Sequence, residues 1–267
     1  DQPAYKAGLK TGDLIIAVNK KSTMNMELQE VVSEIKKKEN KKVVLTIYRD
    51  KKSKDYTVKK SSVQLDTVSY KMKEKKIGYI AVSQFLENTG DQFDKAVTAL
   101  EKKGMKSLII DLRDNGGGLL NTCTQMVSRV IDKDKLIVYT KDKEGNKEEF
   151  KSDSGKTLDI PIIILVNGNT ASASEIMTGC LKDYGKATVV GTTTYGKGIV
   201  QNIMPLTDGS AIKFTIAKYY TPNGTDIHKK GIKPDVKVKM SDAQWKKAQT
   251  DEKADKQLKK AIELLEK

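Results

Sequence analysis

Residues 107–131 read SLIIDLRDNGGGLLNTCTQMVSRVI, and this stretch decides the fold class. Its first six residues, 107–112, are mostly apolar and are followed by glycines, a pattern that predicts a buried strand. The glycine segment 115–118 ends that strand, and the apolar spacing over 119–131 predicts a helix. A buried strand that leads through glycines into a helix is typical of an α/β core.

The same alternation of strands and helices continues on both sides of this stretch. The apolar patterns predict further strands at 77–82, 161–166 and 188–190 and helices at 91–103 and 171–184. They also predict two hairpins, one that pairs 136–140 with 148–151 and one that pairs 199–205 with 211–220 over Asp208-Gly209-Ser210. We therefore expect one α/β domain over residues 63–240. A charged helical tail, 241–267, follows it and carries Leu258, Ile262 and Leu265 on one stripe.

Residues 1–62 have a different pattern and are expected to form a separate small domain. A short helix closed by Gly8 is followed by predicted strands at 14–19, 43–48 and 56–58 and by a helix over 26–38. This order, with its Ala-Gly-Leu…Gly-Asp phrase at 7–13, resembles the second half of a PDZ domain. The loop with which a PDZ domain grips a peptide carboxylate would precede Pro3, so we predict a partial PDZ domain whose peptide binding is weakened.

Composition argues against a nucleic-acid partner. The 267 residues carry a net charge of +14, but only Arg49, Arg113 and Arg129 are arginines, and aromatic residues make up 6%. Base edges and phosphates are read largely by arginine, and single strands are bound by stacked aromatics. A solvated lysine-rich surface accounts for the charge, while a basic nucleic-acid-binding protein stays as a rival that steep salt dependence would support.

Terminal and cysteine patterns leave the cellular compartment open. The longest apolar run, 160–166, is too short to cross a bilayer, and no basic-then-apolar leader opens the sequence. Because Asp1 already lies inside a domain pattern, we expect the true N-terminus to lie upstream. Cys123 and Cys180 fall in apolar helical segments and are expected to be small buried hydrophobes. No metal-ligand spacing occurs, so no metal or other cofactor is predicted.

A first candidate for chemistry is the segment NTASASE, residues 169–175, which follows the strand 161–166 and begins a helix. Ser172 at a helix N-terminus would have free backbone N–H groups and a favourable dipole nearby, as suits a nucleophile whose attack creates an oxyanion. Thr170, Ser172 or Ser174 could equally be plain helix caps.

A serine nucleophile needs a base, and the sequence offers two types. His228 is the only histidine, and its polar surroundings, TDIHKK, indicate a solvated side chain. A lysine can act instead when burial lowers its pKa. Lys197 differs from the other lysines because Gly196 and Gly198 flank it and an apolar strand follows. A turn lysine without catalytic function fits the same pattern.

The segment DLRDNGGG, residues 111–118, would expose several backbone amides at the end of a strand. Such amides could form an oxyanion hole, a phosphate nest or an ordinary loop. The segment lacks the Lys-Ser/Thr ending of a Walker loop and the spacing of a dinucleotide fingerprint.

Together these segments resemble the C-terminal processing peptidases, the tail-specific serine proteases of family S41. The resemblance rests on five phrases in the family's order, PA…AGL…GD (3–13), LRDNGGG (112–118), TASASEI (170–176), YGKG (195–198) and YTPNG…GIKPDV (220–236). It implies a crotonase-like (ClpP/crotonase-type) spiral peptidase core behind the partial PDZ domain.

The resemblance also implies roles for individual residues. Ser172 would be the nucleophile, Lys197 the general base, and Gln201 the residue that holds the lysine amine. The oxyanion hole would be formed by backbone N–H groups of Ala173 and of Gly117 or Gly118. Asp183 matches an acidic position of the family that looks structural rather than catalytic.

The expected reaction is endoproteolysis of protein or peptide substrates near their C-termini through a Ser-Lys dyad and an acyl-enzyme. The rival from another class is a catalytically silent relative that only binds peptides. Such a protein would have no need of Ser172, Lys197 and Gln201 together. By resemblance alone, the protein is placed outside the cytoplasm or at the cell envelope. A membrane anchor in the missing upstream segment and a homo-oligomeric state are both compatible with it.

Overall fold

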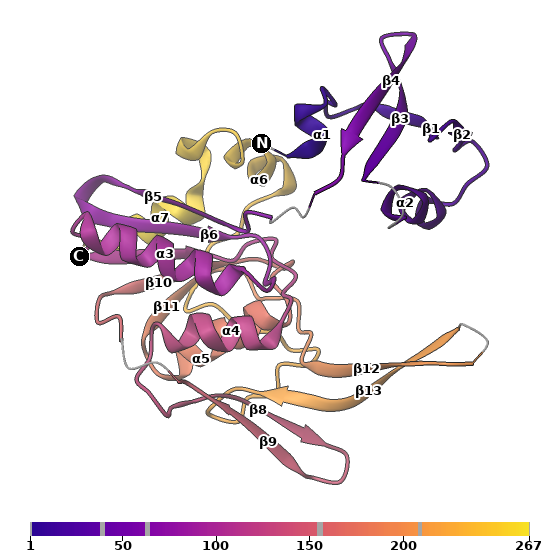
Figure 1. Cartoon of the computed structure of the whole chain (residues 1–267). Coiled ribbons are helices and arrows are strands. Elements are labelled where there is room, and N and C mark those ends of the chain that lie inside the picture. The colour runs from indigo at the N-terminus through magenta and orange to yellow at the C-terminus, as the bar shows by residue number, and fades with distance from the viewer. Residues whose placement is uncertain (1, 38–40, 62–64, 154–156, 208–209, 267) are drawn as a thin grey trace. The chain divides into compact units, whose positions relative to one another are not determined.

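The structure, a computed structural model, describes residues 2–37, 41–61, 65–153, 157–207 and 210–266 (Figure 1). Contacts between residues divide the chain into two units, Asp1–Leu65 and Asp66–Lys267. The sequence placed this boundary after residue 62. It also set the tail 241–267 apart, whereas the structure includes the tail in the second unit because its helices pack on the central sheet of that unit.

The first unit is a four-stranded antiparallel sheet with two helices. Its elements are α1 (Pro3–Lys6), β1 (Leu14–Val18), β2 (Lys21–Ser22), α2 (Leu28–Lys36), β3 (Lys42–Arg49) and β4 (Lys52–Lys59), with the strand order β2-β1-β3-β4. Alternate residues of β3, Val43, Leu45 and Ile47, enter a small core, as a strand with one buried face requires. Val31 and Ile35 of α2 pack against that core.

The second unit is built on a six-stranded sheet. Its strands are β5 (Val68–Met72), β6 (Ile77–Val82), β7 (Ser107–Asp111), β10 (Ile162–Val166), β11 (Ala187–Gly191) and β14 (Val236–Lys237), in the order β14-β11-β10-β7-β6-β5. All neighbouring pairs are parallel except β5 with β6. The predicted α/β class is therefore confirmed. The antiparallel edge strand β5 was not predicted from the sequence.

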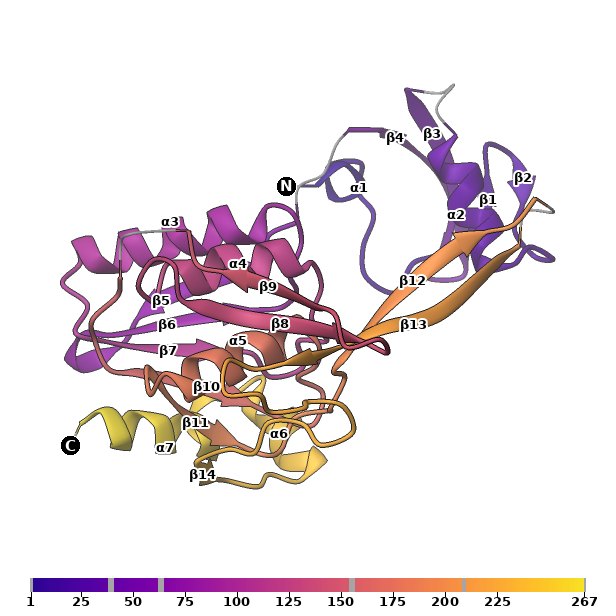
Figure 2. The ribbon, with the colours of Figure 1, turned by 90° about the horizontal axis from the view of Figure 1, so that it is seen from below.

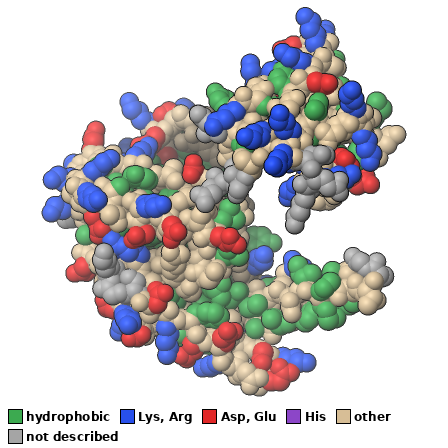
Figure 3. All heavy atoms as spheres, in the orientation of Figure 1, with side chains coloured by type: hydrophobic (Ala, Val, Ile, Leu, Met, Phe, Trp, Pro, Cys, Tyr) green, Lys and Arg blue, Asp and Glu red, His purple; other side chains and the backbone are tan. Residues whose placement is uncertain are grey.

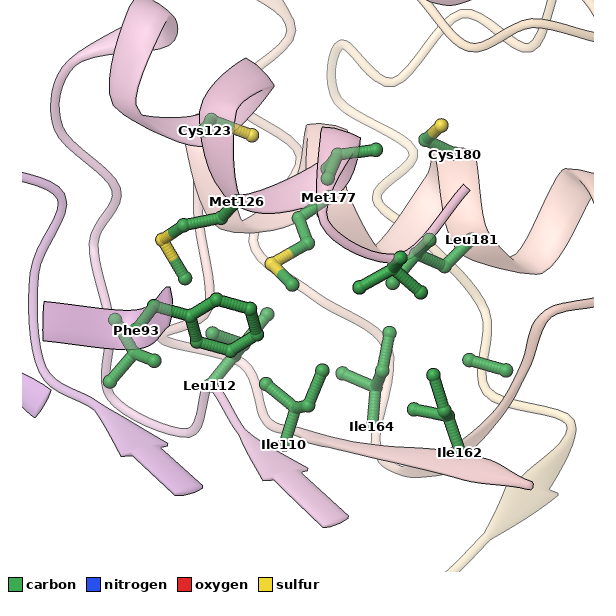
Figure 4. Close-up of a cluster of buried hydrophobic side chains, with 14 of the residues drawn as sticks. Phe93, Ile110, Leu112, Cys123, Met126, Ile162, Ile164, Met177, Cys180 and Leu181 are labelled. Atoms are coloured by element: carbon green, nitrogen blue, oxygen red, sulfur yellow. The ribbon is translucent and has the colours of Figure 1, made fainter. Parts of the chain in front are cut away.

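Both faces of this sheet are buried, which is why its central strands are apolar throughout. In β10, Ile162, Ile164 and Val166 face one core, and Ile163 and Leu165 face another. The first core lies under α3 (Thr89–Lys102), α4 (Leu120–Ser128) and α5 (Ala173–Asp183), and Figure 4 shows part of it. The second lies under α7 (Lys256–Leu265), on the opposite side of the sheet in Figure 2.

A second sheet of four antiparallel strands is attached to this core. It contains β8 (Leu136–Asp142), β9 (Lys147–Lys151), β12 (Ile199–Pro205) and β13 (Ala211–Tyr220), in the order β12-β13-β8-β9. Both predicted hairpins are present, although residues 208–209 of the predicted Asp208-Gly209-Ser210 turn lie outside the described residues. The hairpin β12–β13 exposes Ile203, Met204, Leu206, Ile212, Phe214 and Ile216, which form the apolar stripe seen in Figure 3.

Several helix boundaries differ from those predicted. The helix expected over 171–184 begins only at Ala173, because Ser172 has a positive φ that no α-helix accepts. The helix expected over 119–131 ends at Ser128. The tail contains α6 (Asp242–Ala248), the 3₁₀ turn Glu252–Ala254 and α7, and Leu258, Ile262 and Leu265 of α7 do pack on one core.

Candidate active site

Gly117, Gly118 and Ser172, three of the predicted site residues, lie in the loops at the carboxyl ends of β7 and β10, and Lys197 lies in the loop after β11, the next strand of the same parallel sheet. This edge is where open parallel sheets usually bind ligands. The loop after β7 and the loop after β10 are joined at Asn115, whose carbonyl accepts hydrogen bonds from the Ala171 N–H at 3.0 Å and the Ser174 hydroxyl at 3.0 Å. The Thr170 hydroxyl donates to the Leu112 carbonyl at 2.8 Å. Sequence segments more than 50 residues apart thus form one framework.

Ser172 occupies the N-cap position of α5 in an unusual conformation. Its φ is 57° and its ψ is −120°, whereas the N-cap residues Glu27 and Ser241 are extended. A non-glycine residue in such a region costs about 1–3 kcal/mol and persists only where its surroundings enforce it. The sharp strand-to-helix turn that presents the serine of other hydrolases is strained in the same way. Ser172 does take part in a capping box, but ordinary capping does not require this backbone conformation.

Glu175 is the residue that holds this conformation, and sequence analysis assigned it no role. It is fully buried, and its Oε2 accepts the Ser172 N–H at 2.9 Å and the Lys197 N–H at 2.8 Å. Its Oε1 accepts the Gly196 N–H at 2.7 Å and the Thr194 hydroxyl. One carboxylate oxygen therefore brings the backbones of Ser172 and Lys197 together. The capping-box spacing Ser-x-x-Glu at 172–175 was the signal in the sequence.

Lys197 lies beside Ser172 through this clamp, but its side chain is exposed. Sequence reasoning expected a desolvated lysine, so the expectation of burial is wrong for the chain alone. No hydrogen bond joins the side chains of Ser172 and Lys197 within the part of the chain that the structure describes. Gln201 is exposed on β12 opposite Thr215, and no described contact links it to Lys197.

Gly117 lies directly against the serine. A Cβ atom there would come within 2.8 Å of the Ser172 Cβ and 2.9 Å of the Ala173 nitrogen, and φ is +98°, so only glycine fits. The Gly117 N–H is already donated to Asn115 Oδ1 at 2.9 Å. Among the described residues, the N–H groups of Gly118 and Ala173 have no hydrogen-bond acceptor. These two are therefore the predicted oxyanion donors that the structure leaves available.

His228 is half-buried, and not fully solvated as its polar neighbours suggested. Its Nδ1 is buried and has no hydrogen-bond partner among the described residues. Its backbone lies close to the loop of Lys197, since a Cβ on Gly198 would come within 2.5 Å of the His228 nitrogen. No described contact joins His228 to Ser172.

Behind the glycine loop lies a buried charged cluster around Arg113. Its guanidinium donates to both oxygens of Asp111, which also accepts from the Tyr79 hydroxyl at 2.7 Å. Burial alone would lower the pKa of Arg113, but the hydrogen bonds and charges of Asp111 and Asp255 outweigh it and raise that pKa. Burial beside the Asp111 charge raises the pKa of Tyr79. The arginine therefore stays charged and fixed at the base of the loop.

Three further sequence expectations concern residues outside the reacting centre. The Asp183 carboxylate accepts the Asn223 N–H at 2.8 Å, which is a structural contact. Cys123 and Cys180 are free and buried, as expected for small hydrophobes. Burial raises the pKa of Cys123 to about 12 and also raises that of Cys180.

A groove of about 600 Å³ lies between the two hairpins of the second sheet. Its wall contains Leu120, two residues after Gly118, and Val200, three residues after Lys197. Phe150 and Phe214 add apolar surface. The groove is large enough to take part of an extended peptide.

Within the described ranges, no group of three or more histidine, cysteine, aspartate or glutamate residues could hold a metal ion. The helices described there are all too short or too polar to span a bilayer.

Two family profiles match the sequence. That of peptidase family S41 covers residues 76–238, and that of the PDZ domain covers residues 1–49.

Curated relatives are similar over most of the chain. A probable CtpA-like serine protease of Staphylococcus aureus (strain N315) is 43% identical over 88% of this chain and 48% of its own length. The carboxy-terminal processing protease CtpA of Bacillus subtilis (strain 168) is 42% identical over 90% of this chain and 52% of its own length. The chain thus spans about half the length of these relatives.

Solved structures have the same fold. The photosystem II D1 C-terminal processing protease superposes with a TM-score of 0.61 at 30% identity, covering 88% of this chain and 65% of that one. An S41 protease from Bacteroides fragilis superposes with a TM-score of 0.63, covering 99% of this chain and 75% of that one. Its identity of 18% supports the fold alone.

Proposed function

Because this chain belongs to peptidase family S41, we propose that it is a serine peptidase that cleaves protein substrates near their C-termini. The observation that carries the proposal is the strained Ser172 at the start of α5, joined through Glu175 to the backbone of Lys197. We also propose that the core of the second unit is of the crotonase-like spiral type.

In the proposed mechanism, Ser172 Oγ attacks the carbonyl carbon of the scissile peptide bond while Lys197 Nζ takes the hydroxyl proton. The negative charge that develops on the carbonyl oxygen is stabilised by the N–H groups of Ala173 and Gly118 and by the N-terminal end of α5. Lys197 then protonates the leaving amine, and an acyl-enzyme on Ser172 forms. Water, deprotonated by Lys197, hydrolyses that ester. No metal or cofactor takes part.

A lysine acts as a base only while it is neutral, and exposure favours its charged form. Lys197 is exposed in the chain alone, so we propose that bound substrate supplies the missing burial. A polypeptide in the groove beside Leu120 and Val200 would cover Lys197 and exclude water from it. Gln201 would then hold the lysine amine in position.

The PDZ unit is proposed to bind substrate C-termini and to regulate access to the site. A PDZ domain binds a peptide as an added strand and captures its terminal carboxylate in a loop. We also propose that the protein acts at the cell envelope and that it self-associates.

The second candidate is a peptide-binding relative without activity, which the exposure of Lys197 would favour. The test is digestion of an unfolded protein by the wild type, Ser172→Ala and Lys197→Ala, with Ser69→Ala and Lys133→Ala, both at exposed positions, as matched controls.

The first two variants should each lose cleavage without loss of thermal stability, and the double variant should be scarcely worse because the pair acts as one unit. Retained cleavage in either single variant would reject the dyad. Peptide binding by a wild type that never cleaves would establish the second candidate.

A further inference from the structure

The C-terminal tail contacts the glycine loop as well as the sheet. The apolar side of α7 packs on the sheet through Leu258 and Ala261. Polar side chains of the same tail reach Arg113 and Asp114, the two residues that lead into the loop of Gly117 and Gly118. The apolar contacts alone would cover the sheet, so these polar contacts serve a further purpose.

Arg113 receives much of its binding from the tail. Its Nη1 donates to Asp255 Oδ1 at 3.0 Å and to Gln257 Oε1 at 3.1 Å, and its Nη2 lies 2.8 Å from Asp255 Oδ2. The ring of Trp245 lies over the guanidinium, with 4.5 Å from the Arg113 Cζ to the ring centroid. Since Arg113 is buried, losing these partners would leave unpaired donors in the interior.

Asp114 joins the tail to both active-site loops. Its Oδ2 accepts the indole N–H of Trp245 at 2.8 Å. Its Oδ1 accepts the side-chain amides of Asn167 and Asn169, each at 2.8 Å, from the loop that leads to Ser172. Asp114 itself has a φ of +58°, so its backbone conformation depends on these contacts.

We propose that Trp245 is a positioning residue of the catalytic centre and that the tail completes this centre. The inference rests on the proposed peptidase function. Trp245 acts through Asp114, which sets the distance between the glycine loop and the loop of Ser172. The oxyanion donor of Gly118 must be correctly placed relative to Ser172, because small displacements of such groups strongly reduce the rate.

The variant that tests this role is Trp245→Phe, which keeps an aromatic ring over Arg113 and removes only the N–H donor to Asp114. We expect kcat to fall about tenfold with KM unchanged, because the contact acts on transition-state geometry and not on substrate binding. Leu258→Ala is the matched control in the tail. It should lower the unfolding temperature more than Trp245→Phe does, yet leave kcat unchanged at temperatures where it is folded.

A second measurement does not depend on peptidase activity. Trp245 is the only tryptophan, so intrinsic tryptophan fluorescence reports on this contact alone. Asp114→Asn should shift its emission maximum, because the carboxylate at the indole N–H is replaced by an amide. If the protein is active, labelling Ser172 with a fluorophosphonate, whose phosphoryl oxygen mimics the oxyanion, should also change the emission. The unlabelled Leu258→Ala control should have the emission maximum of the wild type.

The outcomes separate the two hypotheses. A wild type that cleaves, with equal kcat in Trp245→Phe, overturns the positioning role. A fall in kcat that merely parallels lost stability, and is matched by Leu258→Ala, overturns it as well. If the wild type itself does not cleave, the proposed function fails, and the fluorescence measurement alone decides whether the tail is coupled to the loop.

Discussion

Replacing Glu175 by glutamine changes one buried oxygen into an amide nitrogen and leaves the shape of the side chain intact. The carboxylate accepts four hydrogen bonds, three from the backbone N–H groups of Ser172, Gly196 and Lys197 and one from the Thr194 hydroxyl. An amide has one oxygen and one NH₂ group. In either orientation, the NH₂ group of the introduced glutamine would face at least one backbone N–H and leave that donor without an acceptor.

The magnitude follows from these contacts. Each buried donor left unpaired costs about 1–3 kcal/mol, and hydrogen bonds to a charged acceptor are stronger than those to a neutral one. Glu175→Gln should therefore destabilise the protein by roughly 2–4 kcal/mol, which lowers the unfolding temperature by about 5–15 °C. Because Ser172 would be released from its strained conformation and Lys197 from its place beside it, kcat should fall by about 100-fold or more.

The assay combines cleavage of an unfolded protein with thermal unfolding, both at a temperature well below the transition. Glu87→Gln, at an exposed carboxylate, is the matched control and should change neither measurement. A Glu175→Gln variant as stable and as active as the wild type would refute the clamp. Lost stability with full activity would show that the clamp supports the fold but does not position the dyad.

Three other predictions follow from the same structure. Cleavage should rise with pH along a single limb, as a neutral lysine base requires, and His228→Ala should keep that profile; loss of activity in a folded His228→Ala protein would count against the lysine mechanism. Partial burial raises the pKa of Asp114, but hydrogen bonds from Asn169, Asn167 and Trp245 outweigh burial and lower that pKa, so Asp114 stabilises the folded state above about pH 4 and loses this contribution as the pH falls through its folded pKa. Asp114→Asn should therefore flatten the fall in unfolding temperature at acid pH, and an unchanged slope would contradict this. Since burial keeps both thiols neutral, neither Cys123 nor Cys180 should react with a thiol reagent at pH 8 until the protein unfolds, and rapid modification of the native protein would disprove their burial.

Much of the core could be predicted because its pattern is local. The apolar segment 107–112 and the glycines after it determine a strand and a turn by themselves, and the structure has both. The edge strand β5 was missed although its sequence, VSYKM, alternates apolar and polar residues, because so short a segment is recognised as a strand only by its pairing with β6.

The site was harder to predict because its geometry depends on contacts between distant segments. Ser172 and Lys197 could be singled out as a helix-start serine and a glycine-flanked lysine. For Glu175, the capping-box spacing signals only the hydrogen bond from the Ser172 N–H; its other three donors, Thr194, Gly196 and Lys197, lie in a loop that only the folded chain brings to it. The contact of Trp245 with Asp114 spans 131 positions, and no local pattern announces it.

The central claim is that Ser172 is a nucleophile made reactive by Lys197. Its most direct test is reaction with a fluorophosphonate, followed by intact mass measurement and peptide mapping of the wild type and Lys197→Ala. The account predicts a single adduct on Ser172 in the wild type and almost none in Lys197→Ala, because the hydroxyl needs the base to react. An adduct on another residue, or equal labelling of Ser172 in both proteins, would contradict it.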